Sequence, residues 1–551
     1  MAPREPIPSS SDADIKNPKA EQIRLASKSE RRYITRHALD FYRCLIVGGL
    51  YTFTSTSTSP LEPPTGKVRD SACDLRDAKT YIPALKHCIN THPSLATAVQ
   101  DAETEKPIFV RRDRVDLRNH LEIVAPETQS SDLRGDDGED REGQIEKEKE
   151  MLKRTMQKAH DCVLKDVDSV PGWRVVVLPL PVSEPSIAHS RDEPVGTVRR
   201  VYILFAYSHT HSDGRSGLNF HKTFLEGLRL NEQACDDGYI YDTTASSSKT
   251  LPPAVEDVAA LRITWLYLLL TLLGGHVPEF LRRWAGFSMP VATEGTWIGE
   301  VMQYPEAPEQ FRTGVEMLVA KKETMEAVLG VCRVKKGVKF TGLLNALVVR
   351  ALSGALAGDS GADSIVEDFI GQIVIDLRGL VGAYPADMMV NCVSAVYERS
   401  CRVANAKGTD LKNETALWSA ARETTQRLAV SAGTLVNQPI GLVAYLNEFR
   451  PWFLGKLGQK RDSSYEISNA VVFEPPSASE REEWDIERMV FSQPANVTSC
   501  PLSFSVVTRK DGDMVLTLNW QVGVLGVDDE DAFAKDVLAR IDGYLVEIAE
   551  V

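Results

Sequence analysis

The stretch Ser208-His209-Thr210-His211-Ser212-Asp213-Gly214-Arg215-Ser216-Gly217 is the most informative part of this chain. It follows an apolar run, Val201 to Tyr207, that predicts a strand, and it precedes a run, Leu218 to Leu230, that predicts a helix. A histidine at the end of a strand, with a carboxylate four residues later, suits two chemistries. One is a zinc site with several ligands, and the other is proton transfer by a single imidazole.

A zinc site is the weaker interpretation. His-x-His-x-Asp is a familiar metal-binding pattern, but metallo-β-lactamase-like hydrolases follow the aspartate with another histidine, and Gly214 stands there. Zinc needs three or four nitrogen, oxygen or sulfur ligands. The last of the ten histidines is His276, and no Glu, Asp or Cys has a recognisable ligand spacing. The sequence therefore predicts no metal site.

Proton transfer by His209 needs fewer groups. One ring nitrogen would accept the proton of a substrate hydroxyl and return it later to a leaving group. Asp213 would fix the loop through an ion pair, and Gly214 would let a ligand pass close to the backbone. Arg215-Ser216-Gly217 would open the next helix, where free backbone N–H groups hold the loop.

His209-x-x-x-Asp213-Gly214 resembles the active-site motif of CoA-dependent acyltransferases related to chloramphenicol acetyltransferase. That superfamily includes plant BAHD acyltransferases and the condensation domains of peptide synthetases. The residues around the motif are most similar to the fungal alcohol acetyltransferase family. The following segments match that family in order along the chain: Glu30-Arg31-Arg32-Tyr33, Arg36 to Tyr42, Leu251-Pro252-Pro253, Phe340 to Leu344, Ser468-Asn469, Phe491-Ser492-Gln493 and Leu518-Asn519-Trp520.

The resemblance implies an α/β fold of two chloramphenicol acetyltransferase-like subdomains, whose mixed sheets meet at a central tunnel. The mixed order of strands and helices suits such layers. We expect an N-terminal half at 21–285, a crossover at 286–310 and a C-terminal half at 311–551. His209 would sit in the middle of the tunnel, with acyl-CoA arriving from one side and the acceptor from the other.

Two further segments gain roles from the resemblance. Arg378, in Ile375-Asp376-Leu377-Arg378, matches an arginine that pairs with the motif aspartate, which suits a buried Asp213 because buried carboxylates need a partner. The alternative is a surface arginine at a strand end. Ser468 and Asn469 are candidates for stabilising an oxyanion or contacting the acceptor, and the alternative for them is a strand-end hydrogen bond.

This sequence departs from the plant enzymes in two places. Their Asp-Phe-Gly-x-Gly signature is absent, and Val390 stands where a glycine usually precedes the asparagine that corresponds to Asn391. Neither change removes the base. Both make it unsafe to transfer the substrate preferences of plant enzymes to this chain.

The implied activity is transfer of an acyl group, with acetyl expected, from acetyl-CoA to the hydroxyl of a small-molecule, lipid or secondary-metabolite acceptor. No metal is required, and we expect a monomer. One alternative is acylation of an amine by the same base. Another is a non-catalytic or carrier-dependent condensation-like module. The intact His209, Asp213 and Gly214, and the absence of a carrier domain, weigh against that module.

Composition narrows the remaining classes. The 551 residues suffice for two halves. The net charge of −14 argues against binding to nucleic acid, because such binding relies on clustered Lys and Arg. Nine cysteines without Cys-x-x-Cys suit a reducing compartment. Met1 to Pro6 lacks the apolar core of a secretory signal. We therefore expect a cytoplasmic protein, with peripheral contact to an internal membrane as an open alternative.

Three segments stand apart from the predicted core. Residues 1–20 are polar and are expected to be disordered, and residues 126–143 form an acidic insertion that cannot bury a core. The apolar run Ile263 to Gly275 is shorter than the roughly 20 residues that span a bilayer. We expect a buried helix there. The alternative is a helix at a membrane surface, next to the basic and aromatic residues 282–284.

Overall fold

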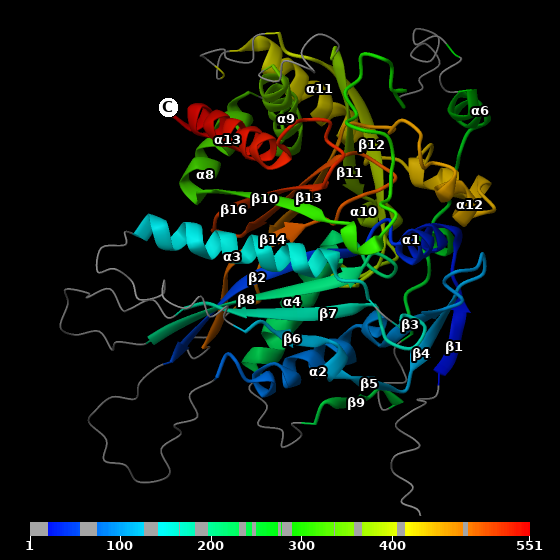
Figure 1. Ribbon diagram of the computed structural model, residues 1–551, viewed down its shortest axis with the longest axis vertical. Coiled ribbons are helices and arrows are strands. Elements are labelled where there is room, and N and C mark those ends of the chain that lie inside the picture. The colour runs from blue at the N-terminus through cyan, green and yellow to red at the C-terminus, as the bar shows by residue number, and fades with distance from the viewer. Residues whose placement is uncertain are drawn as a thin grey trace, which may run out of the picture.

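The computed structural model describes residues 20–55, 74–125, 141–164, 166–181, 197–230, 238–244, 250–273, 277, 289–335, 337–357, 366–404, 411, 414–477 and 483–550 (Figure 1). Two expectations therefore fall mainly outside the described residues. These are the disorder of residues 1–20 and the acidic insertion at 126–143, of which the structure describes residue 20 and residues 141–143.

A five-stranded sheet forms the centre of the first half. Its two longest strands, β2 and β8, pair antiparallel along twelve residues each, from Cys44 opposite Ser208 to Ser55 opposite Thr197. Helices α2 (Ile82–Thr91) and α4 (Gly214–Arg229) pack against each other, and α4 also packs on β2. The strands, in sheet order, are β14 (Trp484–Ser492), β2 (Cys44–Ser55), β8 (Thr197–Ser208), β7 (Trp173–Pro179) and β6 (Leu121–Ile123).

A six-stranded mixed sheet forms the centre of the second half, with the parallel pairs β11–β13 and β13–β15 between antiparallel ones. Its strands, in sheet order, are β10 (Thr313–Ala320), β16 (Met514–Gln521), β15 (Leu502–Arg509), β13 (Tyr465–Phe473), β11 (Asp368–Asp376) and β12 (Val393–Cys401). The helices of this half are α8 (Lys322–Val334), α9 (Phe340–Leu356), α11 (Thr415–Ser431) and α13 (Glu530–Ala549). Helix α9 is buried on nearly all sides, as its Leu, Ala and Val content requires.

Two elements tie the halves together. Strand β14 lies in the second half of the sequence, yet it completes the first sheet by pairing antiparallel with β2. Helix α3 (Arg141–Asp161) runs across both sheets in Figure 1 and contacts β2 and β10. On it, the ammonium group of Lys153 lies 2.8 Å from the carboxylate of Glu316 in β10, and both side chains are buried. The two halves therefore share structure, and the expected boundary at 286–310 stays a prediction.

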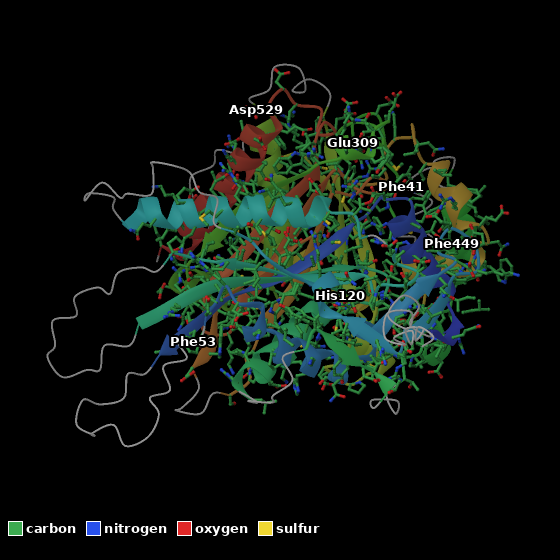
Figure 2. All side chains as sticks on the ribbon, turned by 60° about the horizontal axis from the view of Figure 1, so that its bottom comes forward. Phe41, Phe53, His120, Glu309, Phe449 and Asp529 are labelled. Atoms are coloured by element: carbon green, nitrogen blue, oxygen red, sulfur yellow. The ribbon has the colours of Figure 1, made fainter. Side chains whose placement is uncertain are left out.

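Helix α1 (Lys28–Ala38) links the start of the chain to the second half. It begins at a capping box in which Ser27 and Glu30 satisfy each other's backbone N–H groups. Further along the chain, Phe41 packs in one apolar cluster with Phe449, the first residue of α12 (Phe449–Leu454). Figure 2 shows Phe41 and Phe449 on the same side of the molecule. The smaller strands and helices are β1 (Ala20–Leu25), β3 (Thr97–Gln100), β4 (Ile108–Arg112), β5 (Arg114–Asp116), β9 (Ile240–Asp242), α5 (Val255–Val258), α6 (Trp265–Leu273) and α10 (Arg378–Val381).

The expectation of a buried helix at 263–275 is wrong. Helix α6 lies at the surface, where Trp265 is 85% exposed and Leu272 is 74% exposed, and only Tyr267 and Leu270 of this helix are buried. An apolar composition alone does not show which neighbours cover a helix, and that is why the sequence misled. Among the described residues, none of the helices combines the length and apolarity that a bilayer crossing requires.

Candidate active site

His209 is the first residue after β8, where the sheet ends. Cys44 of β2 and Trp173 of β7 lie opposite the last two residues of β8, so paired strands hold this point on both sides. After the strand, the hydroxyl groups of Ser208 and Thr210 lie 2.7 Å apart and tighten the turn. The loop therefore leaves a rigid sheet, and this places the imidazole reproducibly.

Asp213 is the N-cap residue of α4, and both of its carboxylate oxygens accept hydrogen bonds. Its Oδ1 accepts hydrogen bonds from the backbone N–H of Ser216 at 3.1 Å and from the Ser216 hydroxyl at 3.0 Å, as an N-cap residue does. Its Oδ2 accepts another from the N–H of Cys392 at 3.1 Å. Tyr207 fixes the backbone by donating to the Asp213 carbonyl at 2.7 Å. Every described contact of this side chain keeps the loop in place.

Arg378 meets Asp213 with two parallel hydrogen bonds. Its Nη1 lies 2.8 Å from Oδ2, its Nη2 lies 2.9 Å from Oδ1, and the two side chains are only 5% and 2% exposed. Burial alone would raise the pKa of Asp213, but the Arg378 guanidinium and the backbone donors lower it below its usual range. The sequence predicted this partner, and the surface alternative for Arg378 is wrong.

The pair also joins the halves. Arg378 opens α10 in the second half and donates through Nη2 to the carbonyl of Val390 at 2.8 Å. In the same loop, the Asn391 side chain donates to the carbonyl of His209 at 2.8 Å. The loop that carries His209 is therefore held by its own sheet on one side and by the second half on the other.

The imidazole of His209 lies among aromatic and cationic groups. Its ring stacks on Tyr33 of α1 with centroids 4.3 Å apart and planes 9° apart, and the ring of Tyr42 lies 5.9 Å away. Burial first, and then the positive charge of Arg36, lower the pKa of His209 to about 4, although Asp213 opposes the shift. The ring is therefore neutral at pH 7, with a lone pair free to accept a proton.

Two glycines in the first turn of α4 allow it to pack closely against β14 and β2. A Cβ at Gly214 would lie 2.7 Å from the ring of Phe491, and one at Gly217 would lie 2.3 Å from Val47. The sequence predicted that Gly214 leaves space for a ligand. In the structure, that glycine gives room to Phe491, which itself belongs to β14.

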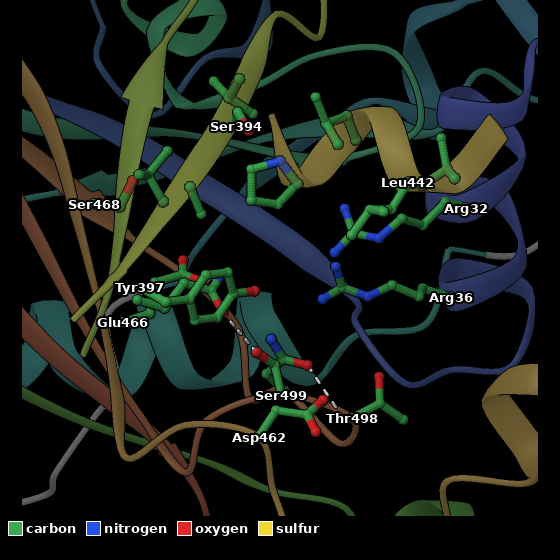
Figure 3. Close-up of a pocket in the computed structure, with 18 of the residues that line it drawn as sticks. Arg32, Arg36, Ser394, Tyr397, Leu442, Asp462, Glu466, Ser468, Thr498 and Ser499 are labelled. Atoms are coloured by element: carbon green, nitrogen blue, oxygen red, sulfur yellow. Dashed lines mark hydrogen bonds between the residues drawn. The ribbon is translucent and has the colours of Figure 1, made fainter. Parts of the chain in front are cut away.

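A cavity of about 760 Å³ opens beside His209 between the two halves. Its lining comes from α1, from the His209 loop, from α6, and from strands β11, β12 and β13 of the second sheet. Figure 3 shows Arg32 and Arg36 on one side of this cavity, with Glu466 and Ser468 on another. The volume is large enough for a drug-sized molecule, and an interface between halves is a usual place for such a cleft.

The two candidates from β13 differ in what their side chains contact. Both line the cavity. The amide of Asn469 donates to the Thr341 hydroxyl at 3.1 Å and its oxygen accepts from the N–H of Val471 at 2.8 Å, so both of its ends are engaged. Ser468 also lines the cavity, and no hydrogen bond of its hydroxyl to another described residue is present. Ser468 is thus the better placed of the two to meet a ligand.

The other two histidines near the motif have different surroundings. His211 points away from the main cavity, toward Phe109, with ring centroids 5.2 Å apart. His221 has both ring nitrogens engaged, with Tyr51 and with the carbonyl of Val47, at 2.8 Å each. Across the described ranges, no three His, Cys, Asp or Glu side chains gather as metal ligands would.

Some cavity residues were missed by sequence reasoning. Tyr33, Arg32 and Arg36 lie in segments quoted for their family resemblance, but no position beside His209 was predicted for them. The spacing of Arg32 and Arg36, one helical turn apart, was the available signal. Glu466, whose burial raises its pKa, gave no signal, because an acidic residue inside a strand has no characteristic neighbours.

The chain is similar to known alcohol acetyltransferases. Residues 146–352 match the family model described as alcohol acetyltransferase. The chain is 23% identical over 532 residues to a probable alcohol acetyltransferase of Fusarium pseudograminearum, covering 94% of each chain. It is 21% identical over 517 residues to a probable alcohol acetyltransferase of Aspergillus fumigatus, covering 92% of this chain and 96% of the relative.

Solved structures confirm the expected fold. A trichothecene 15-O-acetyltransferase from Fusarium sporotrichioides superposes with a TM-score of 0.60 at 14% identity, covering 96% of this chain and 95% of that one. The epimerization domain from the third module of tyrocidine synthetase B gives a TM-score of 0.51 at 10% identity, covering 96% of both chains. At such identities the likeness concerns the fold alone.

Proposed function

We propose that the chain transfers an acetyl group from acetyl-CoA to a hydroxyl of a small-molecule acceptor, with His209 as general base, because residues 146–352 match the alcohol acetyltransferase model and the relatives are probable alcohol acetyltransferases. This similarity supports a CoA-dependent acyltransferase acting on alcohols, in preference to a non-catalytic module. The observation that carries the finer proposal is a neutral imidazole at the wall of the cavity between the halves.

The reaction needs one proton carrier. The imidazole takes the proton of the acceptor hydroxyl while the oxygen attacks the thioester carbonyl carbon. The carbon–sulfur bond then breaks, and the imidazolium returns the proton to the departing CoA thiolate. The net result is that the proton passes from the acceptor to CoA and His209 is neutral again. A low pKa of His209 keeps it unprotonated before attack, so no base is lost to bulk protonation at pH 7.

The tetrahedral intermediate carries a negative oxygen that needs a hydrogen-bond donor. We assign the Ser468 hydroxyl to this role, because it lines the same cavity and Asn469 is engaged elsewhere. Asp213 and Arg378 do not touch substrate in this proposal. They position the loop, and the acceptor and pantetheine arm would occupy the cavity beside it.

The test is a comparison of the unsubstituted protein with His209→Ala. Acetyl-CoA is offered with pooled alcohols and amines, and products are identified by mass spectrometry before and after mild alkali, which cleaves esters and leaves amides. Loss of an acid–base group typically lowers turnover by about 10²- to 10⁴-fold. Ser468→Ala should lower it by about 10²- to 10³-fold, as loss of an oxyanion donor does.

Folding is checked for each variant by its thermal midpoint. Arg118→Gln serves as control, because this arginine is exposed and its one ion pair with a described residue is with the nearby Asp116. Undiminished acyl transfer by a folded His209→Ala protein would reject the base. Products that resist alkali would replace ester formation with amide formation.

A further inference from the structure

Two arginines extend from α1 into the cavity beside His209. Arg32 and Arg36 are four residues apart, so they lie on the same face of the helix. Figure 3 shows both guanidinium groups directed into the cavity, and both residues line it. Like charges at this spacing repel each other, so the helix gains nothing from the arrangement itself.

Neither arginine has an ion-pair partner among the described residues. Arg36 is only 7% exposed, and its Nε and Nη2 are buried without a hydrogen-bond acceptor. Four other cations of the cavity lining have carboxylate partners: Lys456 with Asp462 at 2.7 Å, Lys460 with Glu294 at 2.7 Å, Arg215 with Asp376 at 2.7 Å and Arg378 with Asp213 at 2.8 Å. A further one, Arg461, donates to the backbone carbonyls of Glu300, Asn496, Val497 and Ser499. An unpaired buried guanidinium is costly. Among the described contacts, Arg36 differs from Arg461 because neither a carboxylate nor a backbone carbonyl accepts a hydrogen bond from its side chain.

Glu466 lines the same cavity but forms no ion pair with the two arginines. Its Oε1 accepts from the Gln493 amide at 2.7 Å, and its Oε2 accepts from the Gln372 amide at 2.8 Å. Burial raises the pKa of Glu466 despite these donors and despite the arginines. Both oxygens of Glu466 are therefore bonded to neutral amides, and no carboxylate among the described residues forms an ion pair with Arg32 or Arg36.

Aromatic rings keep the two guanidinium groups in place. The Arg36 guanidinium lies 4.2 Å from the ring centroid of Tyr42, and that of Arg32 lies 5.3 Å from the ring centroid of Tyr33. These are the rings that flank His209. Cation–π contacts orient the cations without neutralising them. The result is a fixed positive site close to the reacting atoms.

We propose that Arg32 and Arg36 bind an anionic group of the acceptor, most simply a carboxylate, so that the enzyme selects hydroxylated acids over neutral alcohols. The inference rests on the proposed function, because it assigns this side of the cavity to the acceptor. Guanidinium groups bind carboxylates through two parallel hydrogen bonds, which also fixes orientation. The phosphates of CoA are the other possible anion. They lie at the far end of the pantetheine arm, away from the thioester that must reach His209.

Direct binding tests the proposal without catalysis. Calorimetry at pH 7.5 compares decanoate with methyl decanoate, using His209→Ala as the protein, so that failure of turnover has no bearing on the result. We expect decanoate to bind about 10- to 100-fold more tightly than the ester, as charge-assisted hydrogen bonds allow. Arg36→Gln introduced into the same protein should remove most of that preference, and Arg118→Gln should leave it intact. Equal binding of acid and ester, or a preference that survives in the Arg32→Gln, Arg36→Gln double variant, overturns the proposal.

Kinetics separate the two possible sources of the anion. In the unsubstituted protein, kcat/KM is measured for 10-hydroxydecanoate and for its methyl ester, each with acetyl-CoA as donor. The KM is then measured for two donors, acetyl-CoA and acetyl-pantetheine, of which the second lacks the phosphates. Arg36→Gln should reduce kcat/KM for the hydroxy acid and leave the KM of acetyl-CoA unchanged. A variant that raises the KM of acetyl-CoA but not of acetyl-pantetheine assigns the arginines to CoA and overturns the acceptor assignment.

Discussion

Two sets of charged side chains lie beside His209, and they differ in whether they have counter-charges. Asp213 and Arg378 form a two-pronged pair in which both carboxylate oxygens have further donors. Arg32 and Arg36 have aromatic rings beside them and no carboxylate paired with them among the described residues. A charge that the protein pairs with a counter-charge belongs to the scaffold, whereas a charge left without a counter-charge in a cavity is available to a ligand.

The largest effect on stability is expected for Arg378→Ala. This change leaves Asp213 buried without its counter-ion, so the free energy of unfolding should fall by about 3–5 kcal/mol. Chemical denaturation measures the loss. Arg540→Ala is the control, because that arginine forms a half-exposed pair with Asp536 one turn away and should cost less than about 0.5 kcal/mol. Equal losses in the two variants would remove the distinction between the pairs.

A smaller loss is expected from Gly217→Ala. The new methyl group would meet Val47 at 2.3 Å and the hydroxyl of Tyr207, which bonds the Asp213 carbonyl, at 2.9 Å. Overpacking of this kind costs about 1–3 kcal/mol, measured again by denaturation. Gly330→Ala, in helix α8 with open space around it, should be neutral or stabilising because alanine favours helices. Similar behaviour of both variants would show that α4 shifts without strain.

The opposite sign is expected for Arg36→Met. Removing a buried cation that lacks a counter-charge should leave stability unchanged or raise it by about 1 kcal/mol, while the methionine still packs on Tyr42. The thermal midpoint checks this. A loss comparable with that of Arg378→Ala would mean that Arg36 is a structural charge after all, and the comparison of the two sets would fail.

The smallest effect is expected from pH near neutrality. Because burial and Arg36 lower the pKa of His209 to about 4, the rate of acyl transfer should be flat from pH 8 to pH 6 and decline only as pH approaches 4. The folded pKa lies below the unfolded value, so acid protonates the unfolded chain first and stability falls as pH drops from about 6.5 toward 4. A pH–rate profile with a midpoint near 6.5 would contradict the burial of this ring. Arg36→Met should move the decline to higher pH.

Much of the site could be predicted because its residues carry local signals. His209 and Asp213 are separated by one short loop, and Arg378 follows a recognisable strand end. The fold class could be predicted for the same reason, because strands such as β8 and β16 are apolar runs that can be recognised in the sequence. Solved structures confirm this fold class. The roles assigned to His209 and Ser468 stay predictions that the variants above test.

The rest could not be predicted because it depends on contacts between distant segments. Nothing in the sequence of β14 shows that it pairs with β2, more than 400 residues earlier. The position of α1 beside His209 follows from its packing on α12, and the exposure of α6 follows from what its neighbours leave uncovered. Such arrangements are set by tertiary structure, and a single sequence reports only local preference.

Strand β14 has a consequence for how the protein is assembled. Without it, β2 would present an open row of backbone N–H and C=O groups, which is a template for pairing with other chains. An N-terminal fragment ending before this strand should therefore aggregate on its own and recover when a fragment carrying β14 is co-expressed. Folding of the first sheet must also wait for the ribosome to release almost the whole chain.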